Sequence, residues 1–295
     1  MHDVIVIGGS YAGMAAALQL LRAYRAVKVI DGGERRNRFA DLSHGFLGQD
    51  GVAAAEIAST ARRQLEAYKT LSWVEGRAVT VTGGKDDFTV TTTDGERHRA
   101  RRLLFAIGLE DQLPEIAGLS ARWGRSVFHC PYCHGYELER GPIGVIATGP
   151  MSVHQAEIVS EWGEVTFLTN GAVEVDADQR RTLENRHVLI EPGLIDRIDG
   201  VADVVFAGGR QLSFAGLFTA PHCVPASSLA EAAGCALEET MMGIQIQTDA
   251  AKLTSVPGVF ACGDVARMPH SVTLAVADGA WAGAQLHRSL VWPDA

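Results

Sequence analysis

The strongest constraint on the fold lies near the start of the chain. Val4–Ile7 is a short β-branched run, as expected for a buried parallel strand. The glycine-rich segment Gly8–Gly13 follows, and an Ala/Leu-rich stretch from Met14 to about Ala23 then predicts a helix. Val27–Ile30 is a second apolar run of strand length. Strand, turn, helix and strand in this order predict a βαβ unit, and therefore an α/β fold with a parallel sheet.

The turn between the first strand and the helix has the composition of a phosphate-binding turn. In Gly8-Gly9-Ser10-Tyr11-Ala12-Gly13, backbone N–H groups and the helix N-terminus can face a pyrophosphate. Asp31 lies about 20 residues further on, where a carboxylate can accept hydrogen bonds from an adenosine ribose. Ser10 replaces the second glycine of the fingerprint, and its Cβ tightens the approach of the pyrophosphate. The segment predicts binding of a dinucleotide.

A second unit of the same order begins in the middle of the chain. Ile143–Ile146 predicts a strand, Ala147–Ser152 a turn, the residues through Trp162 a helix, and Val165–Leu168 the next strand. This repetition indicates an internal duplication of a nucleotide-binding fold. Ala147 now stands for the first glycine and Ser152 for the third small residue, so the fingerprint is degraded.

The strand after this second turn ends in Thr169-Asn170-Gly171. These residues include neither an acid for a ribose nor an arginine for a 2′-phosphate. Arg180 and Arg181 are basic but lie about ten residues beyond the strand. Two interpretations stay open: the domain has kept its sheet and lost its ligand, or it binds a nicotinamide nucleotide weakly or in an altered way.

The remaining segments complete the predicted sheets. Residues 73–109 contain short strands, with a hairpin signal at Asp94-Gly95 and a buried strand at Leu103–Gly108. Val256–Asp264 predicts a turn, a strand and then Gly-Asp, which places Asp264 at the carboxyl end of a strand, where open parallel sheets bind ligands. A buried Ala/Gly-rich helix is expected over about Val272–Leu290.

Charge and composition exclude several classes of function. The 295 residues carry a formal charge of −9, which argues against a nucleic acid as partner. Two basic clusters interrupt this balance. We interpret Arg97–Arg102 as the solvated entry to the strand that follows, whereas Arg35–Arg38 stays a candidate for ligand contact because it follows the nucleotide motif.

The sequence indicates a cytoplasmic protein without membrane segments. No apolar run approaches the roughly 18 residues that a membrane helix needs. Met1-His2-Asp3 leads directly into the first strand, which leaves no room for a signal peptide. In a reducing compartment, closely spaced cysteines are catalytic or metal-binding more often than structural.

Two cysteines stand three positions apart in His129-Cys130-Pro131-Tyr132-Cys133-His134-Gly135-Tyr136-Glu137. This spacing is used by redox dithiols, by zinc sites and, with the following histidine, by haem attachment sites. Haem attachment normally follows export. A zinc site needs a second pair of ligands, whereas the cysteines at 223, 235 and 262 are single and scattered, so no metal site is expected. We therefore interpret Cys130 and Cys133 as a redox dithiol beside a flavin.

Taken together, these motifs resemble the low-molecular-weight thioredoxin reductases. The glycine turn at 8–13, Asp31, Phe105–Gly108, Cys130-Pro131-Tyr132-Cys133 and Val256–Asp264 occur in the order found in that family, over nearly the whole chain. Within it, the C-x-x-C-H-G-Y-E segment is most similar to the branch that includes dithiol oxidases of the gliotoxin and holomycin type and related bacterial oxidoreductases.

The resemblance implies two Rossmann-like, three-layer domains, the second inserted into the first. An FAD-binding domain is expected over 1–110 and 243–295, and a NAD(P)-binding-like domain with the dithiol over 111–242. It further implies a homodimer whose substrate is a thioredoxin-like protein or a small dithiol or disulfide.

It also implies roles for individual residues. Cys133 is expected nearer the flavin, Cys130 is expected to meet the substrate, and His134 stands where reductases have an aspartate acid/base. The residues expected to bind FAD are Gly8, Ser10, Tyr11, Ala12, Gly13, Asp31, Gly32, Arg36, Asn37, His44, Ala78, Val79, Ala106, Gly108, Gly263, Asp264, Ser271 and Val272.

We therefore predict an FAD-dependent dithiol/disulfide oxidoreductase that does not use NADPH efficiently, because the second nucleotide motif is degraded. Two alternatives remain at this point. One is a conventional NADPH-dependent thioredoxin-disulfide reductase. The other is a flavoprotein redox sensor or electron carrier. The direction of electron flow and the substrate are not fixed by the sequence.

Overall fold

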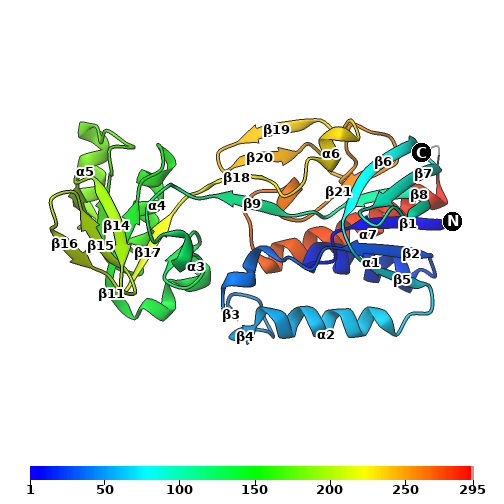
Figure 1. Cartoon of the computed structure of the whole chain (residues 1–295), viewed down its shortest axis with the longest axis horizontal. Helices are drawn as coiled ribbons and strands as arrows, with labels where there is room; N and C mark the ends of the chain where they lie inside the picture. The colour runs from blue at the N-terminus through cyan, green and yellow to red at the C-terminus, as the bar shows by residue number, and fades with distance from the viewer. Residues whose placement is uncertain (294–295) are drawn as a thin grey trace. The chain divides into compact units, whose positions relative to one another are not determined.

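The computed structural model describes residues 1–293 and divides by its internal contacts into two compact units (Figure 1). The first unit comprises 1–38, 53–110 and the described residues from 223 onward, and the second comprises 39–52 and 111–222. The first contains a mixed sheet whose larger part is parallel, the second contains a parallel sheet, and both contain helices. The expected α/β class, with a second nucleotide-type domain inserted into the first, is confirmed.

The first unit is built on a seven-stranded sheet. The strand order is β5 (Leu71–Glu75), β2 (Val27–Asp31), β1 (His2–Ile7), β8 (Arg97–Phe105), β7 (Asp87–Thr92) and β6 (Ala78–Gly84), with β21 (Val259–Ala261) also paired to β8. In the parallel part, Ile7 pairs with both Ile30 and Phe105, and Phe105 pairs with Ala261. The carboxyl ends of four strands therefore lie at one edge, as a ligand site in an open parallel sheet requires.

Helices complete this unit. They are α1 (Tyr11–Arg22), α2 (Ala54–Glu66), the short α6 (Leu229–Ala232) and α7 (Val272–Val291). Helices α1 and α7 run side by side (Figure 1). A four-stranded sheet has the order β19 (Leu237–Thr240), β20 (Gly243–Ile246), β18 (His222–Pro225) and β9 (Leu109–Gln112).

The second unit has a five-stranded parallel sheet. Its order is β10 (Val127–Phe128), β17 (Gly216–Thr219), β11 (Arg140–Ile146), β12 (Gly163–Leu168) and β13 (Leu189–Glu191). It also contains α3 (Pro131–His134), α4 (Met151–Val159), α5 (Ala177–Asn185), an antiparallel sheet of β14 (Ile195–Asp199), β15 (Asp203–Phe206) and β16 (Gln211–Ser213), and a pairing of β3 (Leu42–Ser43) with β4 (Val52–Ala53).

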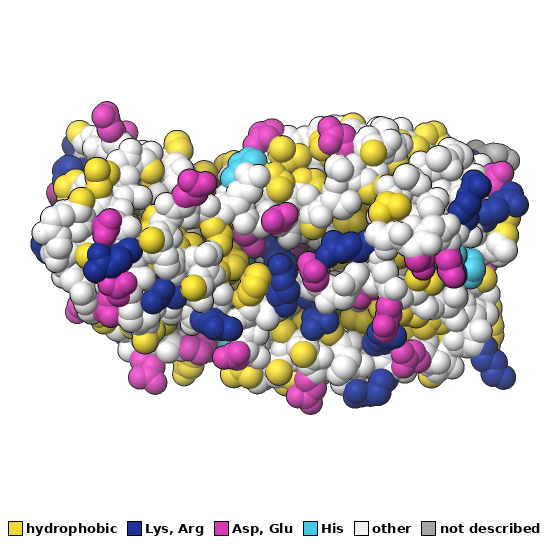
Figure 2. All heavy atoms as spheres, in the orientation of Figure 1, with side chains coloured by type: hydrophobic (Ala, Val, Ile, Leu, Met, Phe, Trp, Pro, Cys, Tyr) yellow, Lys and Arg dark blue, Asp and Glu magenta, His cyan; other side chains and the backbone are white. Residues whose placement is uncertain are grey.

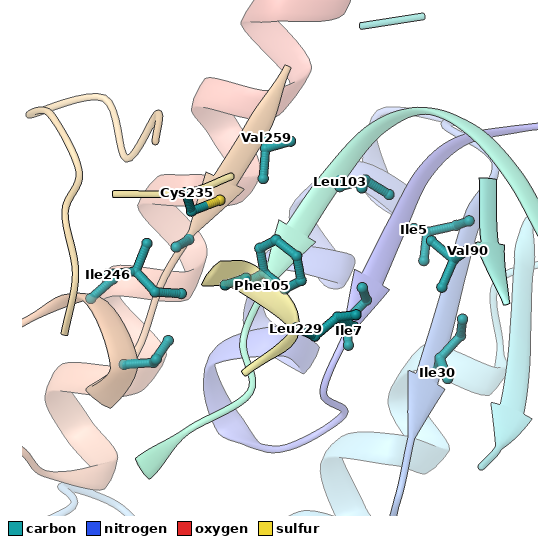
Figure 3. Packing of buried hydrophobic residues seen from close by; sticks show 14 of the residues in the cluster. Ile5, Ile7, Ile30, Val90, Leu103, Phe105, Leu229, Cys235, Ile246 and Val259 are labelled. Carbon is teal, nitrogen blue, oxygen red and sulfur yellow. The ribbon is translucent and has the colours of Figure 1, made fainter. Parts of the chain in front are cut away.

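Apolar side chains from the central strands form the core of the first unit (Figure 3). Ile5, Leu103 and Phe105 are completely buried and pack with Leu229 and Ile246 from later in the chain. Burial of such side chains is worth about 1.5–3 kcal/mol each. The core therefore fixes the strands whose carboxyl ends carry the predicted ligand residues.

One basic cluster lies differently from our expectation. Strand β8 begins at Arg97, so the cluster Arg97–Arg102 lies inside the strand rather than before it. Alternate residues face opposite sides, and His98, Ala100 and Arg102 are buried. Arg102 is 0% exposed and its Nη1 lies 2.8 Å from Asp86 Oδ1. The interpretation of this cluster as solvated was therefore wrong for its inward-facing half.

The contact-based units differ from the expected domains in two segments. Residues 39–52 join the inserted unit, whereas 223–242 join the first. The functional boundaries 1–110, 111–242 and 243–295 stay a prediction. No helix within residues 1–293 is long and apolar enough to cross a membrane.

Candidate functional site

The first glycine turn is held by backbone contacts that exclude larger residues. Gly8 has a φ of 103°, and a Cβ there would lie 2.2 Å from the Ala106 carbonyl oxygen. At Gly13 a Cβ would lie 1.9 Å from the Gly8 carbonyl oxygen. Both values are below any real contact, so these two glycines allow β1, α1 and the end of β8 to meet.

The predicted ribose carboxylate is tied to the same turn. Asp31 ends β2, and its Oδ1 accepts a hydrogen bond from the Gly9 N–H at 3.0 Å. The carboxylate of Asp31 is the group that we expected to meet an adenosine ribose. Tyr11, the first residue of α1, donates from its hydroxyl to the Ala54 carbonyl at 3.0 Å and accepts from Asn37 Nδ2 at 3.2 Å. The turn, the acid and Asn37 thus form one connected cluster.

Asp264 brings the C-terminal segment to this cluster. It follows β21 in the turn η4 (Asp264–Ala266), and its Oδ2 lies 3.0 Å from Arg36 Nη1. Its Oδ1 is buried and accepts no hydrogen bond from any residue in 1–293. A buried carboxylate oxygen without a donor is costly, so a ligand hydroxyl fits this position. Arg36 also donates from Nη2 to the Cys223 sulfur at 3.4 Å, a contact that the sequence did not indicate.

The other predicted cofactor residues lie in several places. Gly108 has a φ of 70°, and Ser271 is the N-cap of α7, where its Oγ accepts from the Leu274 N–H at 3.1 Å. Ala78 and Val79 lie at the start of β6, the last strand of the sheet order. The ends of β1, β2, β8 and β21 lie together at the carboxyl edge of the first sheet. The predicted cofactor residues at or shortly after these ends are Gly8, Ser10, Tyr11, Ala12, Gly13, Asp31, Gly32, Ala106, Gly263 and Asp264.

The dithiol lies in the second unit, at the start of the short helix α3. Cys130 is its N-cap with extended backbone (φ −114°, ψ 113°), and Pro131 is the first helical residue, a position that proline favours. The Cys133 N–H donates to the Cys130 carbonyl at 3.2 Å. Both cysteines are half-buried, whereas Tyr132 between them is 71% exposed. A compact helical turn therefore joins the two half-buried cysteines, with an exposed tyrosine between them.

His134 directly follows the dithiol and is held in its neutral form. Its ring stacks on Phe128, with centroids 4.3 Å apart and an interplanar angle of 19°. Burial, and secondly the charge of His44, lower the pKa of His134 to about 4. At neutral pH the side chain is an uncharged imidazole, which can accept a hydrogen bond from a thiol.

His44 was expected to bind the cofactor, and the structure places it with the inserted unit. Its Nδ1 lies 3.6 Å from Asp50 Oδ1 and its Nε2 lies 3.5 Å from Glu137 Oε1. Glu137 lies in the turn η3 (Tyr136–Leu138), three residues after His134. The segment 39–52 thus adds a histidine and a carboxylate to the surroundings of the dithiol, a contact between distant parts of the sequence. Whether His44 also binds FAD stays a prediction.

Helix α4 supports the dithiol segment at two points. Gln155 donates from Nε2 to the His129 carbonyl at 3.0 Å, directly before Cys130. Trp162, just after the helix, meets the Tyr132 ring edge-on at 5.1 Å between centroids. A Cβ on Gly135 would lie 2.5 Å from the Trp162 ring. None of these supporting residues was identified from the sequence.

The second glycine turn is closed by its own side chains. The Thr148 N–H donates to Ser152 Oγ at 2.9 Å, and Ser152 is completely buried. The Thr148 hydroxyl donates to the Ala220 carbonyl at 2.6 Å. Pro150 has no N–H to offer at the start of α4. The Thr148 N–H is therefore occupied and position 150 offers no N–H, so this turn has fewer donors for a pyrophosphate.

Within residues 1–293, Thr169-Asn170-Gly171 follow β12, as the sequence shows, and they include no arginine that could clamp a 2′-phosphate. Arg180 and Arg181 lie on α5, where both side chains are exposed, and Arg181 pairs with Asp178. Within residues 1–293 there is also no group of three or more His, Cys, Asp or Glu side chains that could hold a metal ion.

Comparison with known proteins agrees with this arrangement. The pyridine nucleotide-disulphide oxidoreductase family matches residues 2–279. "Thioredoxin reductase sirT" of Leptosphaeria maculans is 32% identical over 317 aligned positions, which span 100% of this chain and 96% of the relative. The solved structure of an oxidoreductase from Agrobacterium tumefaciens is 56% identical, with a TM-score of 0.97 over 99% of both chains.

A further solved structure, that of HlmI, is 36% identical with a TM-score of 0.92, covering 99% of this chain and 93% of HlmI. The predicted resemblance to the thioredoxin reductase-like enzymes is thus confirmed, and so is the prediction of an oxidoreductase. Two nucleotide-type domains, a half-buried C-x-x-C pair and these relatives lead to one assignment: the chain belongs to the pyridine nucleotide-disulphide oxidoreductase family.

Proposed function

We propose that this oxidoreductase binds FAD in its first unit and exchanges two electrons with a dithiol substrate through Cys130 and Cys133. The observation that carries the proposal is the neutral His134 stacked on Phe128 directly beside the dithiol. Membership of the family implies FAD, and the first unit offers groups that suit it. Gly8–Gly13, Asp31, Arg36, Asn37 and Asp264 would hold the dinucleotide, which supplies a two-electron acceptor or donor when bound.

The exchange itself needs only the residues of this chain and the substrate. A substrate thiolate attacks the Cys130 sulfur of the disulfide, which breaks the Cys130–Cys133 bond and leaves Cys133 as a thiolate. The second substrate thiol attacks the substrate sulfur of this mixed disulfide and releases Cys130. The substrate has then lost two electrons and two protons, and the cysteine pair has gained the electrons.

His134 handles a proton in this sequence. As a neutral imidazole it can accept a hydrogen bond from an incoming thiol. Because a pKa of about 4 makes the ring a weak base, the proton passes on to solvent and does not stay on the ring. Asp50 and Glu137 flank His44, with carboxylate oxygens 3.6 Å and 3.5 Å from its two ring nitrogens. Charge on His44 in turn disfavours charge on His134.

We further propose that NADPH is a poor electron donor for this protein. The closed Thr148–Ser152 turn and the absence of a clamp after β12 support this proposal. Poor use of NADPH fits best with the oxidation of small dithiols, in which oxygen or another acceptor finally takes the electrons. A conventional NADPH-dependent thioredoxin reductase is the second candidate, and the name of the Leptosphaeria relative favours it.

Partners, assembly and location are parts of the same proposal. The substrate is a small dithiol or disulfide or a thioredoxin-like protein, and the enzyme is a cytoplasmic homodimer. The net charge of −9 and the interspersed acidic and basic side chains on the face in Figure 2 support the expectation that no nucleic acid is bound.

One anaerobic titration tests the function. Purified protein is loaded with FAD, and flavin absorbance is followed during addition of dithiothreitol, NADPH or NADH. We expect bleaching by the dithiol at micromolar to millimolar concentrations and slow, weak bleaching by either nucleotide. Rapid, saturable bleaching by micromolar NADPH would establish the conventional reductase instead. Bleaching by none of the three would favour a redox sensor or an electron carrier.

A further inference from the structure

A buried ion pair lies beside the predicted cofactor turn. Lys252 Nζ is 3.0 Å from Asp278 Oδ1, and the two side chains are only 11% and 12% exposed. Lysine and aspartate are rarely buried to this extent without a partner. Removing both charges from water is costly, and the attraction between them offsets that cost only when further hydrogen bonds are made. The remaining contacts of the pair are therefore informative.

Lys252 and Asp278 each make a further hydrogen bond to the backbone of the same turn, Gly263–Ala266. Asp278 Oδ2 accepts from the Gly263 N–H at 2.9 Å. Lys252 Nζ donates to the Ala266 carbonyl at 2.9 Å. Gly263 and Ala266 are the residues at the two ends of the turn that carries Asp264. The ion pair thus joins the beginning and the end of this turn.

The backbone around Lys252 is arranged to direct its side chain inward. Lys252 has a φ of 66°, a left-handed conformation that is unfavourable for a lysine. The loop is stabilised by Asp249, whose Oδ1 accepts from the N–H groups of Ala251 at 2.8 Å and Leu253 at 2.9 Å. Strained residues that the surroundings maintain are concentrated at functional sites.

Asp278 is held equally firmly from the other side. It precedes Gly279 on α7, where a Cβ would lie 2.1 Å from the Ala12 carbonyl oxygen. A Cβ on Gly263 would lie 2.6 Å from the Ala12 Cβ. The carboxylate of Asp278 is therefore fixed with respect to the first turn of α1 and to the Gly263 backbone.

We propose that Lys252 and Asp278 are positioning residues that hold the Gly263–Ala266 turn so that Asp264 presents its buried carboxylate oxygen to FAD. This inference rests on the proposed FAD binding of the first unit. Without the Lys252–Asp278 ion pair, the Gly263 N–H loses its acceptor and the turn loses its support. Among residues 1–293, Asp264 then keeps only its side-chain contact with Arg36. Neither residue touches FAD in this scheme, so the effect is on affinity.

The test compares two double variants. Both remove the charges of Lys252 and Asp278 together, so that no unpaired charge stays buried. Lys252→Met/Asp278→Asn keeps an amide oxygen for the Gly263 N–H, whereas Lys252→Met/Asp278→Leu removes that acceptor. FAD affinity is measured by quenching of flavin fluorescence on full-length apoprotein, and stability by the melting temperature of the apoprotein. We expect the Leu variant to bind FAD about tenfold more weakly than the Asn variant.

A matched control separates positioning from general stability. Arg102→Met breaks an ion pair between the buried Arg102 and the partly exposed Asp86 in the same unit, away from the turn. It should lower the melting temperature and leave the dissociation constant of FAD within about twofold of wild type. Equal FAD affinity of the two double variants would overturn the proposal, as would a loss of affinity in Arg102→Met as large as in the Leu variant.

A second measurement needs no variant. In wild-type apoprotein, residues 262–266 should be protected from amide hydrogen exchange before FAD is added, because the brace exists without the ligand. Exchange as fast as in an open loop would refute the proposal. A wild-type apoprotein that binds no FAD would instead refute the proposed function, so the two failures are distinguishable.

Discussion

The low pKa of His134 has a measurable consequence for stability. The histidine titrates near 6.5 in the unfolded chain and at about 4 in the folded protein. Between these values the unfolded state binds a proton that the folded state does not. Stability from this source is therefore complete above about pH 6.5 and is lost as the pH falls toward 4.

The magnitude follows from the two pKa values. Between pH 7 and pH 5, a shift of this size removes about 2 kcal/mol of unfolding free energy, out of about 3 kcal/mol in total below pH 4. In the His134→Gln variant this contribution is absent. We expect wild type to lose about 2 kcal/mol more than the variant between pH 7 and pH 5.

Two assays check this expectation. Urea unfolding at pH 7, 6 and 5 gives the difference between wild type and His134→Gln. NMR titration of the His134 ring gives its pKa directly, and the His44→Gln variant should raise that pKa because a charged neighbour is removed. A ring that titrates near 6.5, or identical pH profiles of the two proteins, would show that His134 is not held neutral.

Three further outcomes are expected. Cys130→Ser and Cys133→Ser should each reduce dithiol turnover at least about a thousandfold while FAD stays bound, since neither sulfur can complete the exchange alone; substantial turnover in either variant would contradict the role of the pair. Gly13→Ala should cost about 3 kcal/mol or more and leave the protein colourless, because its Cβ would meet the Gly8 carbonyl oxygen at 1.9 Å; yellow protein of wild-type melting temperature would argue against the turn. Stopped-flow reduction by NADPH should be at least about 100-fold less efficient than in a reductase with an intact phosphate clamp, and Ser152→Gly alone should not restore it; a large gain in Ser152→Gly would show that closure of the turn is the sole barrier.

Local patterns were sufficient to predict the elements that position the first site. The run Val4–Ile7, the glycine turn and Asp31 identified β1, α1 and β2, because strand burial and tight turns impose residue types at short spacing. The expected helix began at Met14, yet α1 begins at Tyr11, since the glycine turn itself runs into the first helical turn. The sequence also predicted that the dithiol precedes the strand that the structure shows as β11, because the C-x-x-C motif and the apolar run are both short local patterns.

Contacts between distant segments could not be predicted in this way. His44 and Glu137 lie close together because residues 39–52 belong to the inserted unit. The amino-acid sequence around His44 and around Glu137 does not indicate this contact. Lys252 and Asp278 likewise look like solvated charges in the sequence. Burial of a charge depends on tertiary packing, which periodicity and motif spacing do not encode.

The pairing of β21 with β8, and of α7 with α1, has a consequence for biosynthesis. The glycines of α7 pack on the α1 backbone, where a Cβ at Gly283 would lie 2.5 Å from the Ala16 carbonyl oxygen. During translation, residues 111–222 leave the ribosome long before this helix does. The surroundings of the Gly8–Gly13 turn are therefore complete only after the C-terminal segments have been synthesised. FAD is then expected to bind after synthesis of the chain is finished. Ribosome-stalled chains that end before residue 259 should bind no flavin, whereas the released chain should acquire it.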